Sequence, residues 1–218
     1  MSQIYTNTHR QLQQQYGTEA LADAIEAAAV NEALQPDQSE FIARQIMFFL
    51  SSIDEQGRPT VSYKGGTAGF VKVLNNRQLM FPSYDGNGMF YSMGNIAANP
   101  QVGLLFVDFQ TPNRLRAQGR ASLVDAGPEL AAYPGADLVV KLDIEQVWVN
   151  CARYVHQFSL TEASPYVPAT DGSAPVAMWK RIEGMAALLS PEDQSLVESA
   201  GTITAVEYAT KLAQGEVI

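Results

Sequence analysis

Residues 46–82, IMFFLSSIDEQGRPTVSYKGGTAGFVKVLNNRQLMFP, decide the fold class. β-branched and aromatic residues recur there in short runs, and turn-forming residues around Gly57 and Asn76 separate the runs. This pattern is typical of antiparallel hairpins with short connections. It predicts strands at residues 46–54, 60–64, 69–74 and 78–82.

The strand pattern continues to residue 150, with helical segments on either side and one inserted within it. Further strands are predicted at 102–109, 114–125 and 136–150. Helices are predicted at 8–34, 36–44, 88–98, near 127–134 and from about 179 to 212. Gly17 offers a break in the first of these, and Pro100 stops the helix at 88–98, because the residue before a proline is pushed out of the helical region. The pattern therefore predicts a small barrel with helical additions, since closure is how such sheets avoid exposed edges.

Composition and charge limit the classes of function. The net charge of −9 argues against nucleic acid or an anionic membrane as a partner. Residues 56–120 nevertheless carry +5, which leaves −14 on the rest of the chain. This local excess favours a small anionic ligand, although outward-facing, solvated strand residues explain it equally well.

The few cysteines and histidines restrict disulfide and metal chemistry, and the apolar runs bear on targeting. Cys151 is the only cysteine, so neither an intramolecular disulfide nor a cysteine-rich zinc site can form. His9 and His156 are the only histidines, which argues against a multi-histidine metal centre. The N-terminus lacks the basic start and apolar stretch of a signal peptide, and no apolar run is long enough to span a membrane, so we predict a cytoplasmic protein.

The loop at residues 82–90, PSYDGNGMF, is unusual between a strand and a helix. Glycines at Gly86 and Gly88 allow a ligand to approach the backbone, and Asn87 can cap the predicted helix at its positive end. Together these features predict a site for an anion. Lys64, which precedes two glycines at a strand end, can reach over the same anion. A tight turn with an N-cap is the alternative explanation of this loop.

The order of these motifs resembles the pyridoxamine 5'-phosphate oxidase-related flavoproteins, the FMN-binding split-barrel family. The match runs from about Phe48 to Asp125, and NCARYVHQ (150–157) is similar to the ending of one uncharacterised branch. The resemblance implies a mainly β (α+β) fold: an antiparallel split β-barrel with a helical N-terminal arm, one inserted helix and a helical C-terminal end. It implies one FMN-binding domain over 1–218, with the arm at 1–45, the barrel at 46–150 and a C-terminal extension at 151–218.

The resemblance also implies a homodimer with two FMN molecules in clefts between the subunits. Carried over by position, the residues implied to bind the cofactor are Ser62, Lys64, Pro82, Ser83, Asn87, Gly88, Ser92, Arg114 and Arg116. True pyridoxamine 5'-phosphate oxidases have an Arg-Lys pair where this chain has Tyr91 and Ser92. Vitamin B6 oxidation is therefore the least favoured function, and we expect Lys64 with Arg114 or Arg116 to supply the missing charge.

Other residues have a structural and a functional interpretation. Cys151 is either a reactive thiol or a small apolar residue, and His156 is a proton donor, an iron ligand or neither. Trp148 and Trp179 either pack in the core or lie beside the flavin ring.

The sequence contains no convincing catalytic dyad or triad, which suits an enzyme whose cofactor performs the redox step. The leading hypothesis is an FMN-dependent oxidoreductase that moves a hydride or electrons between a nicotinamide or deazaflavin donor and a small organic acceptor. The alternative is a non-catalytic protein that binds or sequesters flavin or heme.

Overall fold

The computed structural model describes residues 2–216, which form two compact units. The first unit comprises the chain up to Ala132 together with Ala136–Ser159, and it holds the whole sheet. The second comprises Tyr133–Gly135 and the chain from Leu160 onward. No helix within residues 2–216 combines the length and the apolar character needed to cross a bilayer. One domain over the whole chain stays a prediction.

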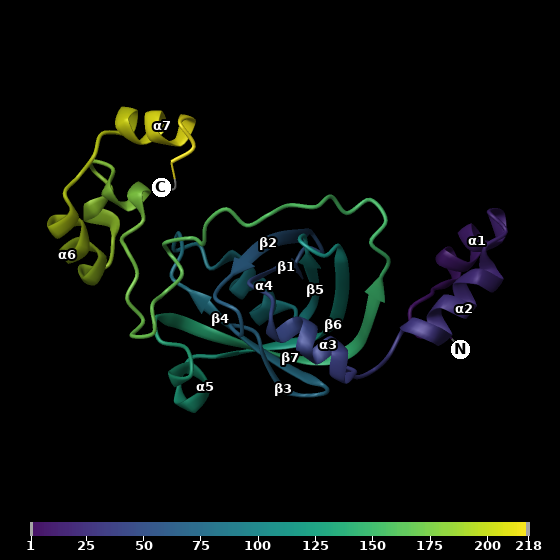
Figure 1. The fold of residues 1–218 in the computed structure, drawn as a ribbon. Helices are drawn as coiled ribbons and strands as arrows, with labels where there is room; N and C mark the ends of the chain where they lie inside the picture. The colour runs from purple at the N-terminus through teal and green to yellow at the C-terminus, as the bar shows by residue number, and fades with distance from the viewer. Residues whose placement is uncertain (1, 217–218) are drawn as a thin grey trace. The chain divides into compact units, whose positions relative to one another are not determined.

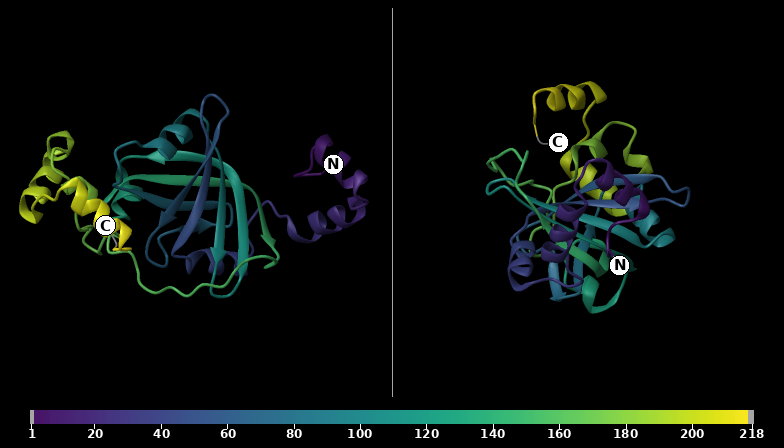
Figure 2. Two further views of the ribbon diagram at one scale, coloured as in Figure 1. Left: turned by 90° about the horizontal axis from the view of Figure 1, so that it is seen from above. Right: turned by 90° about the vertical axis from the view of Figure 1, so that its right-hand side faces the viewer.

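Seven antiparallel strands form a single sheet in the first unit (Figure 1). They are β1 (Met47–Ile53), β2 (Pro59–Gly65), β3 (Lys72–Asn75), β4 (Gln78–Tyr84), β5 (Gln101–Asp108), β6 (Asn113–Val124) and β7 (Ala136–Asn150). Their order is β2-β1-β5-β6-β7-β4-β3, and the sheet coils around its core (Figure 2). The mainly β fold with an antiparallel split barrel is confirmed. The sheet is not closed, however, and β2 and β3 remain its two edges.

An aromatic cluster occupies the centre of the barrel core. Phe48 on β1 is fully buried, and its ring centroid lies 4.9 Å from that of Phe81 and 5.3 Å from that of Phe106. Phe70 completes the cluster at 5.8 Å. Residues of four separate segments therefore meet at one ring, so the core depends on strand pairing across the whole barrel.

Three of the five helices described in this unit accompany the sheet. They are α3 (Pro36–Ala43), α4 (Tyr91–Ala98) and α5 (Gly127–Ala131). α3 and α4 contribute Ile42 and Ile96 to the barrel core, and α4 packs against β1 and β6. α4 is the inserted helix of the prediction, and it covers part of the inner face of the sheet.

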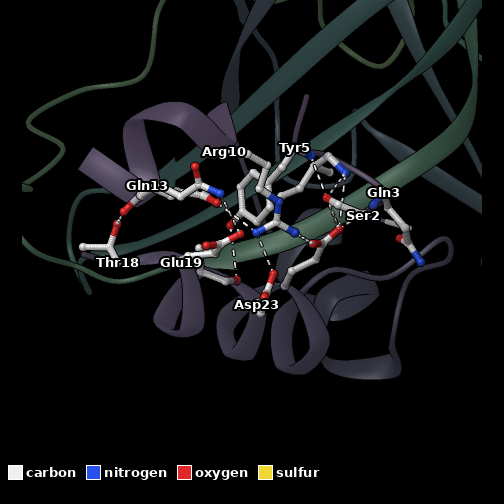
Figure 3. Close-up of polar contacts among 12 residues, drawn as sticks. Ser2, Gln3, Tyr5, Arg10, Gln13, Thr18, Glu19 and Asp23 are labelled. Atoms are coloured by element: carbon white, nitrogen blue, oxygen red, sulfur yellow. Dashed lines mark hydrogen bonds and ion pairs between the residues drawn. The ribbon is translucent and has the colours of Figure 1, made fainter. Parts of the chain in front are cut away.

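The N-terminal arm is a helical hairpin made of α1 (Asn7–Gln15) and α2 (Glu19–Ala29). Gly17, with φ of +66°, forms the predicted break between the two helices. Polar contacts hold the hairpin together (Figure 3): Arg10 forms an ion pair of 2.6 Å with Asp23. Neither helix has a buried residue, so this polar network replaces an apolar core in the arm.

Short helices make up the regular structure of the second unit up to residue 216, together with an isolated β-bridge between Ile182 and Ile203. The helices are two 3-10 turns at Met178–Arg181 and Ala186–Leu188, α6 (Pro191–Ala200) and α7 (Ala205–Ala213). Lys180 is buried there, and its Nζ lies 2.8 Å from Asp193 Oδ1. The predicted C-terminal helix is thus interrupted, because Pro191 and Gly201 mark the two ends of α6.

Candidate functional site

The edge strand β2 has an inner and an outer face. Residues of a strand alternate between faces, so Ser62 and Lys64 share one face while Val61 and Tyr63 share the other. Lys64 pairs with Phe48, a core residue of β1, and Ser62 pairs with Leu50, which is also fully buried. Ser62 and Lys64 therefore belong to the inner face.

The first turn of α4 meets this inner face. Ser92 Oγ lies 3.0 Å from Ser62 Oγ, which joins two residues that are 30 positions apart in the sequence. Phe90 is the N-cap of α4, and no side chain caps the helix. The backbone N–H groups at the start of the helix therefore keep their capacity to bind an acceptor. The structure thus brings together Ser62 and Ser92 from the predicted set.

Lys64 is a half-buried cation without a counter-ion. Its Nζ forms no hydrogen bond and no ion pair with any of residues 2–216. Burial lowers the pKa of the Lys64 ammonium, since removal from water disfavours the charged form. An anion beside Lys64 would restore the solvation that the ammonium has lost.

The loop before α4 differs from its prediction. The helix begins at Tyr91 and not at Gly88, and Met89, which precedes it, is two-thirds exposed. Asn87 does not cap the helix: its Oδ1 accepts a hydrogen bond of 3.1 Å from the backbone N–H of Met89. Gly88 has φ of +72° and Phe90 has φ of +46°. These left-handed residues keep the chain out of the helical conformation until Tyr91.

Pro82 and Ser83 are buried on β4, where they pair with Val139 and Leu138 of β7. β4 pairs with β3 only from Gln78 to Met80, so Pro82 lies beyond the end of that neighbour. Tyr84 follows at the strand end, and burial raises the pKa of its hydroxyl. No hydrogen bond among residues 2–216 joins Pro82 or Ser83 to Lys64.

Arg114 and Arg116 lie on the outer face of β6. Leu115 between them is buried in the core, so the two arginines project from the opposite side of the sheet. β6 is three strands away from β2, a distance of about 14 Å at the usual strand spacing of about 4.8 Å. Within one chain, the structure therefore separates both arginines from Lys64.

Both arginines are held by neighbours on β7 or just beyond it. Arg114 Nη2 donates to the backbone oxygen of Cys151 at 2.5 Å, while Arg114 Nε is buried without a hydrogen-bond partner among residues 2–216. Arg116 Nη1 donates to the side-chain oxygen of Asn150. Burial, and secondarily the charge of Arg114, lowers the pKa of the Arg116 guanidinium.

The remaining candidates lie outside this inner-face site. Cys151 is exposed, and a backbone hydrogen bond from Arg153 is the main cause that holds the pKa of its thiol below the usual value. His156 is exposed, and residues 2–216 contain no group of three or more metal-type ligands. Trp179 belongs to the second unit, where Lys180 Nζ lies 5.9 Å from its ring centroid. Their roles stay predictions.

A row of partly exposed side chains crosses the outer face of the sheet from the edge strand β2 through β1, β5 and β6 to β7. Strand pairing aligns Tyr63, Phe49, Leu105, Arg116 and Trp148 in this order. None of the five is buried, and Tyr63 is 62 % exposed. We call these residues the outer row. Strand alternation signals such a face, but the sequence does not indicate which strands are neighbours, so this surface was not predicted.

Comparison with known proteins finds one family model, described as Pyridoxamine 5'-phosphate oxidase, which matches residues 34–151. No curated protein matches the chain. Among solved structures, HupZ of Group A Streptococcus is 15 % identical, with a TM-score of 0.45 over 58 % of this chain and 99 % of its own. HutZ, the heme storage protein of Vibrio cholerae, is 24 % identical, with a TM-score of 0.40 over 53 % and 94 %.

Proposed function

Because the chain belongs to the pyridoxamine 5'-phosphate oxidase family, we propose that it binds FMN and acts as an FMN-dependent oxidoreductase. Its reaction would move a hydride or electrons between a nicotinamide or deazaflavin donor and a small organic acceptor. One observation carries the proposal: the half-buried ammonium of Lys64 has no counter-ion among residues 2–216, and it shares a strand face with the Ser62–Ser92 pair.

The residues of the inner face suit a phosphate group. A phosphate dianion accepts charge-assisted hydrogen bonds, and such bonds are stronger than neutral ones. Lys64 supplies a cation, Ser62 and Ser92 supply hydroxyl donors, and the first turn of α4 supplies backbone N–H groups. The donor set therefore matches the phosphate end of FMN in kind and in charge.

Bound FMN would supply the hydride and electron chemistry, and the chain would bind and orient it. We assign phosphate binding to Lys64, Ser62 and Ser92, and contact with the ring to Pro82 and Ser83 on β4. Vitamin B6 oxidation is disfavoured, because Ser92 stands where that activity uses a cation and already contacts Ser62.

Replacing Lys64 with methionine should weaken FMN binding about 10- to 150-fold, since a charge-assisted hydrogen bond contributes about 1.5 to 3 kcal/mol. Fluorescence titration of purified protein with FMN, and separately with riboflavin, measures the effect. Riboflavin lacks the phosphate, so its affinity should be low for the parent and unchanged in the variant. Lys72→Met on β3 is the matched control and should bind FMN normally. Equal affinity of the parent and Lys64→Met for FMN would place the phosphate elsewhere.

The absorption spectrum of protein purified from cells separates the proposal from its alternative. Bound flavin gives maxima near roughly 370 and 450 nm, whereas a strong band near roughly 410 nm indicates heme. Anaerobic reduction of the bound flavin by NADPH would then support an enzyme, and a heme band without flavin would support a heme-binding protein.

We also propose that the protein is a homodimer that associates through the outer row. Tyr63 and the neighbouring Val61, which is 65 % exposed, are large apolar residues on an edge strand, where they favour association. Arg116 belongs to the same face and Arg114 lies beside it on β6. In such a dimer, Arg116 would approach the flavin of the partner subunit and not the one at its own Lys64, whereas the backbone oxygens of Cys151 and Arg153 hold Arg114.

In light scattering, the protein should have twice the chain mass of 23.7 kDa. Tyr63→Glu should shift it to the monomer, because a carboxylate in the apolar interface would lose its water. Leu74→Glu is the control, since Leu74 is an exposed apolar residue on the other edge strand, β3, and this variant should stay dimeric. A parent protein of monomer mass with FMN bound would contradict the dimer.

A further inference from the structure

A cavity lies between α3 and β6, and it contains none of Ser62, Lys64 and Ser92 of the proposed flavin site. Its volume is about 250 Å³, enough for a molecule of modest size. The residues that matter for its chemistry are Asp37, Glu40, Phe41, Arg44, Arg114 and Val149. Two guanidinium groups, two carboxylates and an apolar surface thus line a single cavity.

The charged side chains of this cavity are not paired with each other. None of Asp37, Glu40, Arg44 and Arg114 forms an ion pair within 4 Å among residues 2–216, although Arg44 lies near enough to Asp108 to interact with it electrostatically. Glu40 and Arg44 are four residues apart on α3, a spacing that commonly pairs opposite charges on a helix. Here the Arg44 guanidinium instead lies over the Phe41 ring, 5.1 Å from its centroid. The opposite charges are therefore held apart around the cavity.

The arrangement separates the charges along one wall. Asp37 and Arg44 lie seven residues apart on the same face of α3, which is about 10 Å along the helix axis. Arg114 stands on β6, where the backbone oxygens of Cys151 and Arg153 hold its guanidinium. The cavity is thus lined by charges of both signs, with Asp37, Glu40 and Arg44 along α3 and Arg114 on β6.

We infer that this cavity binds a small zwitterion of the amino-acid type. Its carboxylate binds Arg44 and Arg114, for which guanidinium groups have a suitable fork of donors. Its ammonium binds Glu40 and Asp37, and its apolar side chain lies against Phe41 and Val149. The carboxylates of Glu40 and Asp37 would repel a simple anion. The guanidinium groups of Arg44 and Arg114 would repel a simple cation.

Isothermal titration of the full chain with L-leucine, L-methionine and L-phenylalanine tests the inference. At least one should bind with saturation. For L-leucine, 4-methylpentanoate lacks the ammonium and 3-methylbutylamine lacks the carboxylate, and matched analogues exist for the other two. Each analogue should bind at least about tenfold more weakly than its parent amino acid, since a charged hydrogen-bonding pair is removed.

Arg44→Met and Glu40→Gln should each lower the amino-acid affinity at least about tenfold. Arg77→Met, which breaks an exposed ion pair with Glu32 outside the cavity, is the control and should change nothing. FMN affinity should stay at the parental value in Arg44→Met, so failure here is distinguishable from failure of the flavin site. Three results would each overturn the inference: no saturable binding of any of the three amino acids, an unchanged affinity in Arg44→Met, or an analogue without the ammonium or without the carboxylate that binds as tightly as its parent amino acid.

Discussion

Replacing Gly119 with valine is expected to destabilise the protein by about 3 kcal/mol or more. Gly119 lies on β6 at a register shift in the pairing with β7. A Cβ atom there would lie 1.9 Å from the backbone oxygen of Asp143 and 2.9 Å from its carbonyl carbon. Backbone cannot rotate away as a side chain can, so the two strands must separate at the centre of the sheet.

Urea unfolding followed by circular dichroism measures this loss, and Gly103→Val is its matched control. Gly103 lies on β5, directly opposite Gln118 of β6, and a Cβ atom there would meet nothing closer than 3.9 Å. Valine also favours strands, so this variant should stay within about 1 kcal/mol of the parent. Equal unfolding midpoints for the two variants would show that β6 tolerates a side chain at the register shift.

Truncating Phe48 to alanine is expected to cost about 3 to 5 kcal/mol of unfolding free energy. Its ring is fully buried and meets Phe81 edge to face, Phe106 at a tilt and Phe70 in a stack. Alanine would leave a cavity among three rings that belong to different segments. These rings cannot close the space without shifting their own strands, so most of the lost contact energy is not recovered.

The same urea titration measures the Phe48 variants. Phe48→Leu should lose less than Phe48→Ala because it keeps more of the buried volume. Phe158→Ala is the control for the loss of an aromatic ring, since Phe158 is 60 % exposed, and it should stay within about 1 kcal/mol. A Phe48→Ala protein as stable as Phe158→Ala would contradict the central place of this cluster.

The strands and most helices followed from local features of the sequence. Alternating apolar residues with turns near Gly57 and Asn76 predicted hairpins, and Gly17 predicted the break between α1 and α2. The start of α4 was placed wrongly at Gly88. The spacing of apolar residues extends back to Met89, but the left-handed Gly88 and Phe90 delay the helix to Tyr91.

For the candidate site, the sequence by itself determined that Ser62 and Lys64 belong to a strand and that Ser92 belongs to the helix inserted two strands later. Only the tertiary structure decided that Ser62 meets Ser92, that Lys64 faces inward without a counter-ion among residues 2–216, and that Arg114 projects from the opposite face three strands away. Strand alternation is local and shows which residues share a face. Which face is buried depends on long-range pairing, such as that of Gln78 with Asp143, and no local pattern encodes it.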